Sequence, residues 1–150
     1  MKVRFATIED SNDILTWRND SESRKNFKDS SIISEASHKE WFEDKLGSKK
    51  ARLVVSELNE EKIGVTRFEV EDGSILVSIN LSPHSRGKGY GSKMLLLSEE
   101  ILDFGSKEKE DYYKAEIYKD NIASIKIFEK AGYVLKSSKD NILLYTKLIK

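Results

Sequence analysis

Three glycines at alternate positions mark the segment of this 150-residue sequence that is best suited to chemistry. The segment is Arg86-Gly87-Lys88-Gly89-Tyr90-Gly91-Ser92. Because glycine has no Cβ, the backbone N–H groups of such a loop can converge on one point. A helix that starts here would add unpaired N–H groups and the positive end of its dipole. These features favour binding of a pyrophosphate, and Arg86, Lys88 and Lys93 add local positive charge.

Two other phosphate-binding patterns do not fit this loop. A P-loop requires G-x-x-x-x-G-K-S/T, which the sequence lacks. A dinucleotide fingerprint requires G-x-G-x-x-G at a tight strand-to-helix turn, but the sixth position here is Ser92 and residues 82–86 separate the strand from the first glycine. A glycine-rich turn that only reverses the chain and begins a helix remains an alternative.

Hydrophobic periodicity predicts the elements that position the loop. We expect helices from a Thr7 or Asp10 cap to Asn19, from a Ser34 or Ser37 cap to Gly47, from the glycine loop through Phe104, and at Asn121–Ala131. We expect strands at Lys2–Ala6, Arg52–Leu58, Ile63–Val70, Ser74–Leu81, Tyr113–Tyr118, Tyr133–Leu135 and Ile142–Leu148. The pattern predicts one α+β domain over residues 1–150.

Composition excludes several classes of function. The 26 basic and 26 acidic residues give a formal net charge of +0, whereas a nucleic-acid binder normally has a basic surplus. With 0 Cys there is no disulfide, cysteine zinc site or thiol nucleophile. No stretch approaches the roughly 20 apolar residues of a membrane span, and the N-terminus lacks the apolar run of a signal peptide. We therefore expect a cytoplasmic protein that uses no metal and binds neither membranes nor nucleic acids.

Two blocks of sequence resemble the GNAT family of acetyl-CoA-dependent N-acetyltransferases. Residues 86–91 match the family's Q/R-x-x-G-x-G/A loop, and a second block begins about 30 residues later with Asn121, Ala123, Ser124, Phe128, Glu129, Lys130, Gly132 and Tyr133. Together they make residues 74–137 similar to the family. A further resemblance in residues 17–42 is to the subgroup that includes acetyltransferases of UDP-linked 4-amino-6-deoxy sugars and of ribosomal-protein N-termini. The resemblance implies a GNAT-like mixed, mostly antiparallel sheet of about seven strands flanked by about four helices.

The resemblance also implies where acetyl-CoA binds. The cofactor would lie between two strands that splay apart, Ser74–Leu81 and Tyr113–Tyr118, with a bulge near Ile79–Leu81 leaving backbone groups free for the pantetheine arm. The Leu81 N–H would stabilise the oxyanion, and Phe128 would pack on the thioester. The loop amides would bind the pyrophosphate, Asn121 would hydrogen-bond the cofactor arm, and Lys126 or Lys130 would reach the 3′-phosphate. Asn121 could instead only cap a helix, and the two lysines could instead be solvated surface residues.

The usual catalytic side chains of the family are absent. The position of its tyrosine acid holds Phe128, and that of its glutamate base holds Leu76. Protons could leave through water held by Ser78 or Asn80. His38, with an ordinary pKa of about 6.5, is a second candidate for accepting the proton. We also expect His38 to contact the acceptor, with a position on the helix surface as the alternative. For His84 we expect a solvent-facing position in the loop.

The expected acceptor site lies in the N-terminal half. We expect Trp17 and Trp41 to line it, with core packing as the alternative for both, and Arg18 and Arg24 to pair with a diphosphate of the acceptor. The predicted function is transfer of acetyl from acetyl-CoA to a primary amine by direct attack, with a nucleotide-linked amino sugar as acceptor. The alternatives are a protein N-terminus, a small polyamine, or a non-catalytic acyl-CoA-binding domain. A second copy could pair with an exposed edge of the C-terminal strand.

Overall fold

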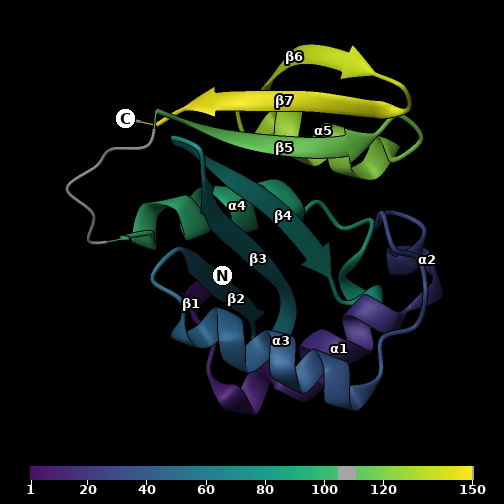
Figure 1. Cartoon of the computed structure of the whole chain (residues 1–150), viewed down its shortest axis with the longest axis vertical. Helices are drawn as coiled ribbons and strands as arrows, with labels where there is room; N and C mark the ends of the chain where they lie inside the picture. Colours follow the sequence, from purple (N-terminus) through teal and green to yellow (C-terminus); the bar gives the residue numbers. More distant parts are fainter. Residues whose placement is uncertain (105–110, 150) are drawn as a thin grey trace.

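A computed structural model describes residues 1–104 and 111–149. Its seven strands form one sheet in the order β1-β2-β3-β4-β5-β7-β6 (Figure 1). The pairs are antiparallel except β4 with β5, which is parallel. The predicted mixed, mostly antiparallel sheet is therefore confirmed. The strands are β1 (Lys2–Phe5), β2 (Ala51–Leu58), β3 (Glu61–Glu71), β4 (Ser74–Leu81), β5 (Tyr112–Tyr118), β6 (Val134–Lys139) and β7 (Ile142–Leu148).

The helices cover both faces of the sheet, with α1 and α3 on one face and α4 and α5 on the other (Figure 1). They are α1 (Ser11–Asn19), α2 (Ser21–Arg24), α3 (Glu35–Gly47), α4 (Gly91–Ile101) and α5 (Ile122–Lys130), and 3-10 turns lie at Ile8–Asp10 and Pro83–Ser85. Within the described residues, no helix is long and apolar enough to cross a bilayer.

Of the two caps predicted for α3, Ser34 is the one present, because its hydroxyl accepts the Ser37 N–H at 3.1 Å. Other details differ from the sequence prediction. Strand β6 covers Val134–Lys139 instead of Tyr133–Leu135. Helix α4 ends at Ile101, so Phe104 lies beyond it, and the four-residue α2 was not predicted. The C-terminal strand β7 lies inside the sheet, so the exposed edge expected of it belongs to β6, whose side chains are all exposed.

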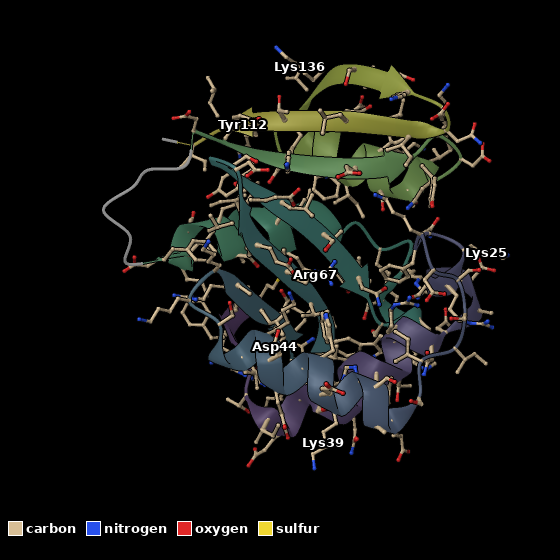
Figure 2. All side chains as sticks on the ribbon, in the orientation of Figure 1. Lys25, Lys39, Asp44, Arg67, Tyr112 and Lys136 are labelled. Carbon is tan, nitrogen blue, oxygen red and sulfur yellow. The ribbon has the colours of Figure 1, made fainter. Side chains whose placement is uncertain are left out.

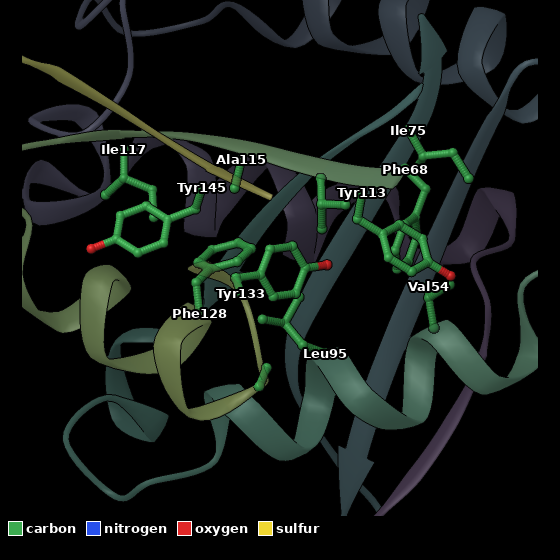
Figure 3. Packing of buried hydrophobic residues seen from close by; sticks show 12 residues of the cluster. Val54, Phe68, Ile75, Leu95, Tyr113, Ala115, Ile117, Phe128, Tyr133 and Tyr145 are labelled. Carbon is green, nitrogen blue, oxygen red and sulfur yellow. The ribbon is translucent and has the colours of Figure 1, made fainter. Parts of the chain in front are cut away.

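Two apolar clusters hold the helices to the sheet. The first, which we call the α4/α5 core, includes Phe68, Leu95 and Phe128 and fills the space beneath α4 and α5 (Figure 3). The second, the α1/α3 core, consists of Ile14, Trp17, Phe42, Leu53, Val55 and Val65. Residues of β3 contribute to both clusters because successive side chains of a strand point to opposite faces.

Glu99 of α4 joins the two halves of the sheet. Its carboxylate accepts the Tyr133 hydroxyl at 2.8 Å and the Lys147 ammonium at 2.6 Å, and both donors come from the β5–β7 half. Burial, together with the Glu99 charge, raises the pKa of Tyr133, so the phenol keeps its proton and donates. We call this group the Glu99 clamp.

Asp10 fixes the beginning of the chain beneath α1. Its side chain is 1% exposed. The carboxylate accepts two hydrogen bonds from Arg4, at 2.8 and 2.9 Å, and a third from the Thr7 N–H. It also forms an ion pair with Lys62 at 2.8 Å. Burial opposes ionisation, but the bonds from Arg4, Lys62 and Thr7 outweigh it and hold the pKa of Asp10 well below its usual range.

Asp10 should therefore make stability depend on acid. The ionised carboxylate stabilises the fold above the unfolded-state pKa of about 3.9, and this contribution is lost as pH falls toward the lower folded-state pKa. We expect Asp10→Asn to cost about 3 kcal/mol at pH 7, the lower end for breaking a buried ion pair, because Arg4 and Lys62 reach solvent. The variant should also lose less additional stability than the wild type between pH 4 and pH 2.

Urea unfolding at pH 7, pH 4 and pH 2 measures both effects. Asp13→Asn is the control, because Asp13 also pairs with Lys62 but is 52% exposed, and it should change stability by less than about 0.5 kcal/mol. Equal effects of the two substitutions would contradict the role given to Asp10.

Candidate active site

Strands β4 and β5 pair at one end and separate at the other. Their parallel pairing covers three residue pairs in the described structure, Ser74 to Leu76 with Tyr112 to Lys114. Beyond this point β4 continues to Leu81 and β5 to Tyr118, and the two ribbons diverge (Figure 1). The splayed strand pair predicted from the sequence is present, and we call the space between the diverging ends the opening.

The register of β4 decides which backbone groups face the opening. The Ser82 N–H donates to the Ile63 carbonyl at 2.8 Å, so the pair Ile63/Ser82 exchanges hydrogen bonds. Because such pairs alternate along an antiparallel ladder, Asn80 and Ser78 also bond to β3, whereas the N–H and C=O groups of Leu81 and Ile79 point away from it. The Arg86 guanidinium accordingly reaches the Leu81 carbonyl at 3.4 Å from outside the ladder.

The bulge predicted near Ile79–Leu81 is wrong. Strands β3 and β4 pair in unbroken register from Glu71/Ser74 to Gly64/Leu81. The backbone groups are free because β5 leaves the edge of β4, and no extra residue in β4 is needed.

The glycine loop lies at the end of β4 and leads into α4. Gly87 and Gly89 have φ angles of +73° and +79°, the left-handed region that favours glycine, and a Cβ at either would meet no atom within 4 Å. Helix α4 begins without a side-chain cap and has no acidic residue in its first turn. The loop therefore presents open backbone beside an uncapped helix N-terminus, as anion binding requires.

Gly91 has a different role from the other two glycines. A Cβ at this position would collide with the side chain of Ile127 on α5. Gly91 therefore permits the close packing of α4 on α5, while Ser92 after it is buried. The side chains of Lys88 and Lys93 are exposed beside the loop, and that of Tyr90 is half-buried.

The sequence predicts that Arg86 adds positive charge to the loop, but its guanidinium is paired within the protein. Its guanidinium binds the Asp20 carboxylate at 2.7 Å and the Ser23 hydroxyl at 2.6 Å. The Ser23 hydroxyl in turn donates to Asn80 Oδ1 at 3.0 Å. This network, which we call the Arg86 network, ties α2 to the end of β4, and it reduces the positive charge left for a ligand in the loop.

Asn121 and Phe128, both predicted to contact the cofactor, differ in whether their side chains are available to a ligand. Asn121 Oδ1 caps α5 by accepting the Ser124 N–H at 3.2 Å, and its amide nitrogen has no hydrogen-bond partner among the described residues. Phe128 is 2% exposed, and its ring meets Tyr133 edge-on at 4.9 Å in the α4/α5 core (Figure 3). The prediction that Phe128 packs on a thioester is therefore wrong, because the ring is enclosed by the protein.

Lys126 and Lys130, the residues expected to reach the 3′-phosphate, are exposed on α5.

His38 is buried, contrary to the prediction that it is an exposed base. The residue is 3% exposed, its ring stacks on Phe42 at 5.5 Å, and its Nε2 lies 3.1 Å from the Ser11 carbonyl. A carbonyl can only accept, so Nε2 carries a proton. Burial lowers the pKa of His38 and outweighs the opposing effect of the Ser11 bond. The imidazole is thus a neutral member of the packing between α1 and α3. His84 is exposed, as predicted.

The two tryptophans also differ. Trp17 is 6% exposed in the α1/α3 core, so it does not line an acceptor site. Trp41 is half-buried and borders a surface hollow of about 350 Å³ with Ser37, Glu40 and Asp44. The Arg67 guanidinium lies 5.5 Å from its ring centre.

The predicted acceptor residues Arg18 and Arg24 bond to backbone carbonyls. The Arg18 guanidinium lies 3.8 Å from the centre of the Phe27 ring, and its Nη2 donates to the Asp29 carbonyl at 2.7 Å. Its Nη1 is buried and has no hydrogen-bond partner in the described part of the chain. Arg24 donates to the carbonyls of Asn19 and Ser30. Both side chains thus hold the segment after α1.

Sequence reasoning missed Asp20, Ser23 and Arg67. The first two contact Arg86 from more than 60 positions away, and no local pattern reports such a contact. Arg67 could have been found, because alternation with Val65 and Glu69 in the predicted strand places it on the α1/α3 face.

In the described part of the chain, no three His, Asp or Glu side chains are grouped to hold a metal.

Comparison with known proteins agrees with this geometry. A family model described as an acetyltransferase (GNAT) domain matches residues 1–134. The chain belongs to the GNAT acetyltransferase family. Its sheet and helices are those of the GNAT fold, and the protein is accordingly an acetyltransferase by family. No curated protein matches the sequence.

Solved structures share the fold at low identity. A ribosomal-protein-alanine N-acetyltransferase from Brucella melitensis has a TM-score of 0.79 at 19% identity, covering 99% of this chain and 100% of that one. A spermidine N-acetyltransferase from Vibrio cholerae, in complex with CoA and spermine, has 0.79 at 14% identity, covering 99% and 94%. An aminoglycoside acetyltransferase in complex with coenzyme A has 0.79 at 21% identity, covering 97% and 92%.

The Arg86 network predicts energetic coupling between two distant residues. Arg86→Gln and Asp20→Asn each remove the ion pair, so the double variant should lose less stability than the sum of the single losses. We expect a coupling energy of about 1 kcal/mol, since charged hydrogen bonds contribute somewhat more than this but both side chains are partly exposed. Urea unfolding of the four proteins measures it, and simple additivity would show that the contact contributes nothing.

Proposed function

We propose that this protein transfers the acetyl group of acetyl-CoA to the nitrogen of a primary amine. One observation carries the proposal: the backbone groups of Ile79 and Leu81 point into the opening, immediately before an open glycine loop and an uncapped helix. A ligand with an amide-rich arm and a pyrophosphate suits both features, because the arm can complete the strand edge while the pyrophosphate accepts loop N–H groups. Coenzyme A has this composition, and two of the similar solved structures contain it.

The residues proposed to hold acetyl-CoA follow the path from β4 to α4 and α5. Ile79 and Leu81 would bind the pantetheine arm through their backbone, and the free amide of Asn121 would reach it from α5. The pyrophosphate would lie on the N–H groups of the loop. These are contributed by residues 86–92, namely Arg86, Gly87, Lys88, Gly89, Tyr90, Gly91 and Ser92, with Lys88 and Lys93 adding charge.

In the proposed reaction the neutral amine attacks the acetyl carbonyl carbon directly. A bond from nitrogen to carbon forms, the carbon–sulfur bond breaks, and the thiolate leaves with a proton while the amine loses one. Acetyl-CoA supplies the activated thioester. The Leu81 N–H is the donor proposed for the oxyanion, and water held by Ser78 or Asn80 is proposed to carry the proton. The Ser78 hydroxyl has no hydrogen-bond partner within the described residues, whereas Asn80 Oδ1 already accepts from Ser23.

The chain contributes mainly by positioning the two substrates. Phe128 and His38 are both buried, and Leu76 has no acidic group, so none of the side chains considered as acid or base reaches the opening. Holding amine and thioester together can itself supply a large share of the rate acceleration. An amine flanked by electron-withdrawing oxygens, as in a nucleotide-linked amino sugar, would need less help to lose its proton and is the acceptor we propose.

A non-catalytic acyl-CoA-binding domain is the second candidate. The same lack of a side-chain base or acid favours it. Release of free thiol from acetyl-CoA in the presence of amines separates the two, because binding alone releases none. A protein N-terminus and a small polyamine are the other acceptors to include in this assay.

We also propose that a second copy of the chain pairs with the exposed edge of β6. Val134 and Leu135 on this strand are 68% and 50% exposed, which supports the proposal.

Two matched glycines test the cofactor site. Gly89 and Gly73 have the same φ of +79°, and a Cβ at either would meet no atom within 4 Å, but Gly73 lies in the β3–β4 hairpin turn. Alanine at either position should therefore cost a similar 1–2 kcal/mol, roughly the left-handed penalty. Only Gly89→Ala should weaken CoA binding, by about tenfold or more, because the added methyl group projects into the proposed pyrophosphate site.

Calorimetric titration with CoA measures the affinities. Saturating CoA should raise the melting temperature of the wild type, since ligand at a hundredfold excess over Kd adds about 2.7 kcal/mol. Equal CoA affinity in the two variants would overturn the loop assignment, and an absence of CoA binding by the wild type would overturn the proposed function.

A further inference from the structure

Three arginines come from neighbouring elements, Arg18 from α1, Arg24 from α2 and Arg67 from β3, and the charges of Arg67 and Arg24 both act on Arg18. We call Arg18, Arg24 and Arg67 the arginine cluster. Arg67 lies across from Ser78 of β4, so both side chains are on the α1/α3 face of the sheet. Figure 2 shows Arg67 in front of the sheet, between β4 and α3. Ser78 is on the same strand as Ile79 and Leu81, and Arg67 is one strand away, so a molecule that contacts both would lie beside the edge that faces the opening.

The charge of the arginine cluster is poorly balanced. Among the described residues, Arg18 and Arg24 make hydrogen bonds only to backbone carbonyls, which carry no net charge. Arg67 has one carboxylate contact, 3.5 Å from Nε to Glu69, and Glu69 also pairs with Lys45 at 3.3 Å. Asp29 is the acidic residue near Arg18, but its carboxylate already accepts the N–H and hydroxyl of Ser31.

The cost of this arrangement is visible at Arg18. Its Nη1 is buried and has no hydrogen-bond partner in residues 1–104 and 111–149. Burial lowers the pKa of Arg18; the Asp29 charge opposes this, and the charges of Arg67 and Arg24 add to it. Guanidinium groups held together in this way favour a nearby anion, which would offset their mutual repulsion.

Arg67 is the member that a ligand can reach. Its side chain is 32% exposed, and no hydrogen bond to its two terminal nitrogens is found among the described residues. Trp41 lies against it at 5.5 Å and limits the directions in which the guanidinium can point. A planar guanidinium with two free N–H₂ groups suits bidentate binding of phosphate or carboxylate oxygens.

We propose that Arg67, supported by the positive charge of Arg18 and Arg24, binds an anionic group of the amine acceptor, so that this enzyme acetylates amines bearing a phosphate or carboxylate and disfavours polycations. The inference rests on the proposed function and narrows its acceptor class. It also separates this chain from the spermidine acetyltransferase whose fold it shares, because spermidine carries positive charge alone.

Matched acceptors test the proposal. Thiol release is measured with glucosamine 6-phosphate against glucosamine, with a dipeptide against its C-terminal amide, and with spermidine. We expect the anionic member of at least one pair to have a kcat/KM at least tenfold higher, equivalent to 1.4 kcal/mol. The phosphate and carboxylate pairs show which anion is bound. Arg67→Gln should reduce this preference to about threefold or less. Arg67→Lys should restore only part of it, since lysine keeps the charge but not the planar fork.

Lys136→Gln is the control, because it removes the same charge from an exposed site on β6, far from the cluster (Figure 2). It should leave the preference unchanged, and unchanged CoA affinity in Arg67→Gln shows that the fold and cofactor site are intact. A preference for spermidine, or an anionic preference that survives Arg67→Gln, would overturn the inference.

Failure of the proposed function gives a different result. If CoA binds but no amine releases thiol, transfer is excluded while the arginine cluster can still be tested by calorimetric titration with glucosamine 6-phosphate. Binding that Arg67→Gln abolishes supports the anion site, and absence of binding to the wild type overturns it.

Discussion

The separation of β4 from β5 is the constraint on which the rest of the molecule depends. A buried sheet normally pairs its backbone N–H and C=O groups, and leaving them unpaired is costly unless water or a ligand replaces the missing strand. Here the parallel pairing in the described structure ends at Leu76 and Lys114. Everything beyond that point on β4 has one paired edge and one available edge, which makes the opening a site for a strand-like ligand.

The opening also requires that the two halves of the sheet be joined elsewhere. On the α4/α5 face the Glu99 clamp and the contact of Gly91 with Ile127 join them, and the aromatic packing of Tyr113 on Phe68 at 6.1 Å adds to this. On the opposite face the Arg86 network holds α2 against the end of β4. An ion pair from Lys28 to Glu116 of β5 reaches the other half, but its exposure makes it a minor contribution. The strands can therefore diverge without the halves separating.

Much of this could be predicted from the sequence because it depends on local patterns. The glycine loop, the approximate positions of the strands and the Asp72-Gly73 hairpin are visible in the sequence, and a two-residue hairpin fixes the register of β3 with β4. That register alone determines that Leu81 and Ile79 face away from β3, so the expectation of a bulge was unnecessary. The contacts of Arg86 could not be predicted from local patterns. Its partners Asp20 and Ser23 are distant in sequence, and they reach Arg86 because α2 packs against the end of β4.

Burial was the property that sequence patterns predicted least well. His38 and Phe128 belong to residue types that serve both cores and active sites, and the fold assigns both to cores. The exposed edge expected of the C-terminal strand was also wrong, because adjacency in sequence does not decide which strand of a hairpin joins β5. Trp17 and Trp41 illustrate the same point, since helical spacing places both near the sheet but not at the same depth.

The alternation along β4 has a consequence for amide deuterium exchange in the free protein. The Asn80 amide lies in the ladder and is protected, whereas its neighbours at positions 79 and 81 face solvent and exchange quickly. A bound strand-like ligand slows exchange at those two neighbours and leaves Asn80 nearly unchanged. Binding in the opening should therefore slow amide exchange at every second residue of β4. A general stabilisation of the fold would not produce this pattern.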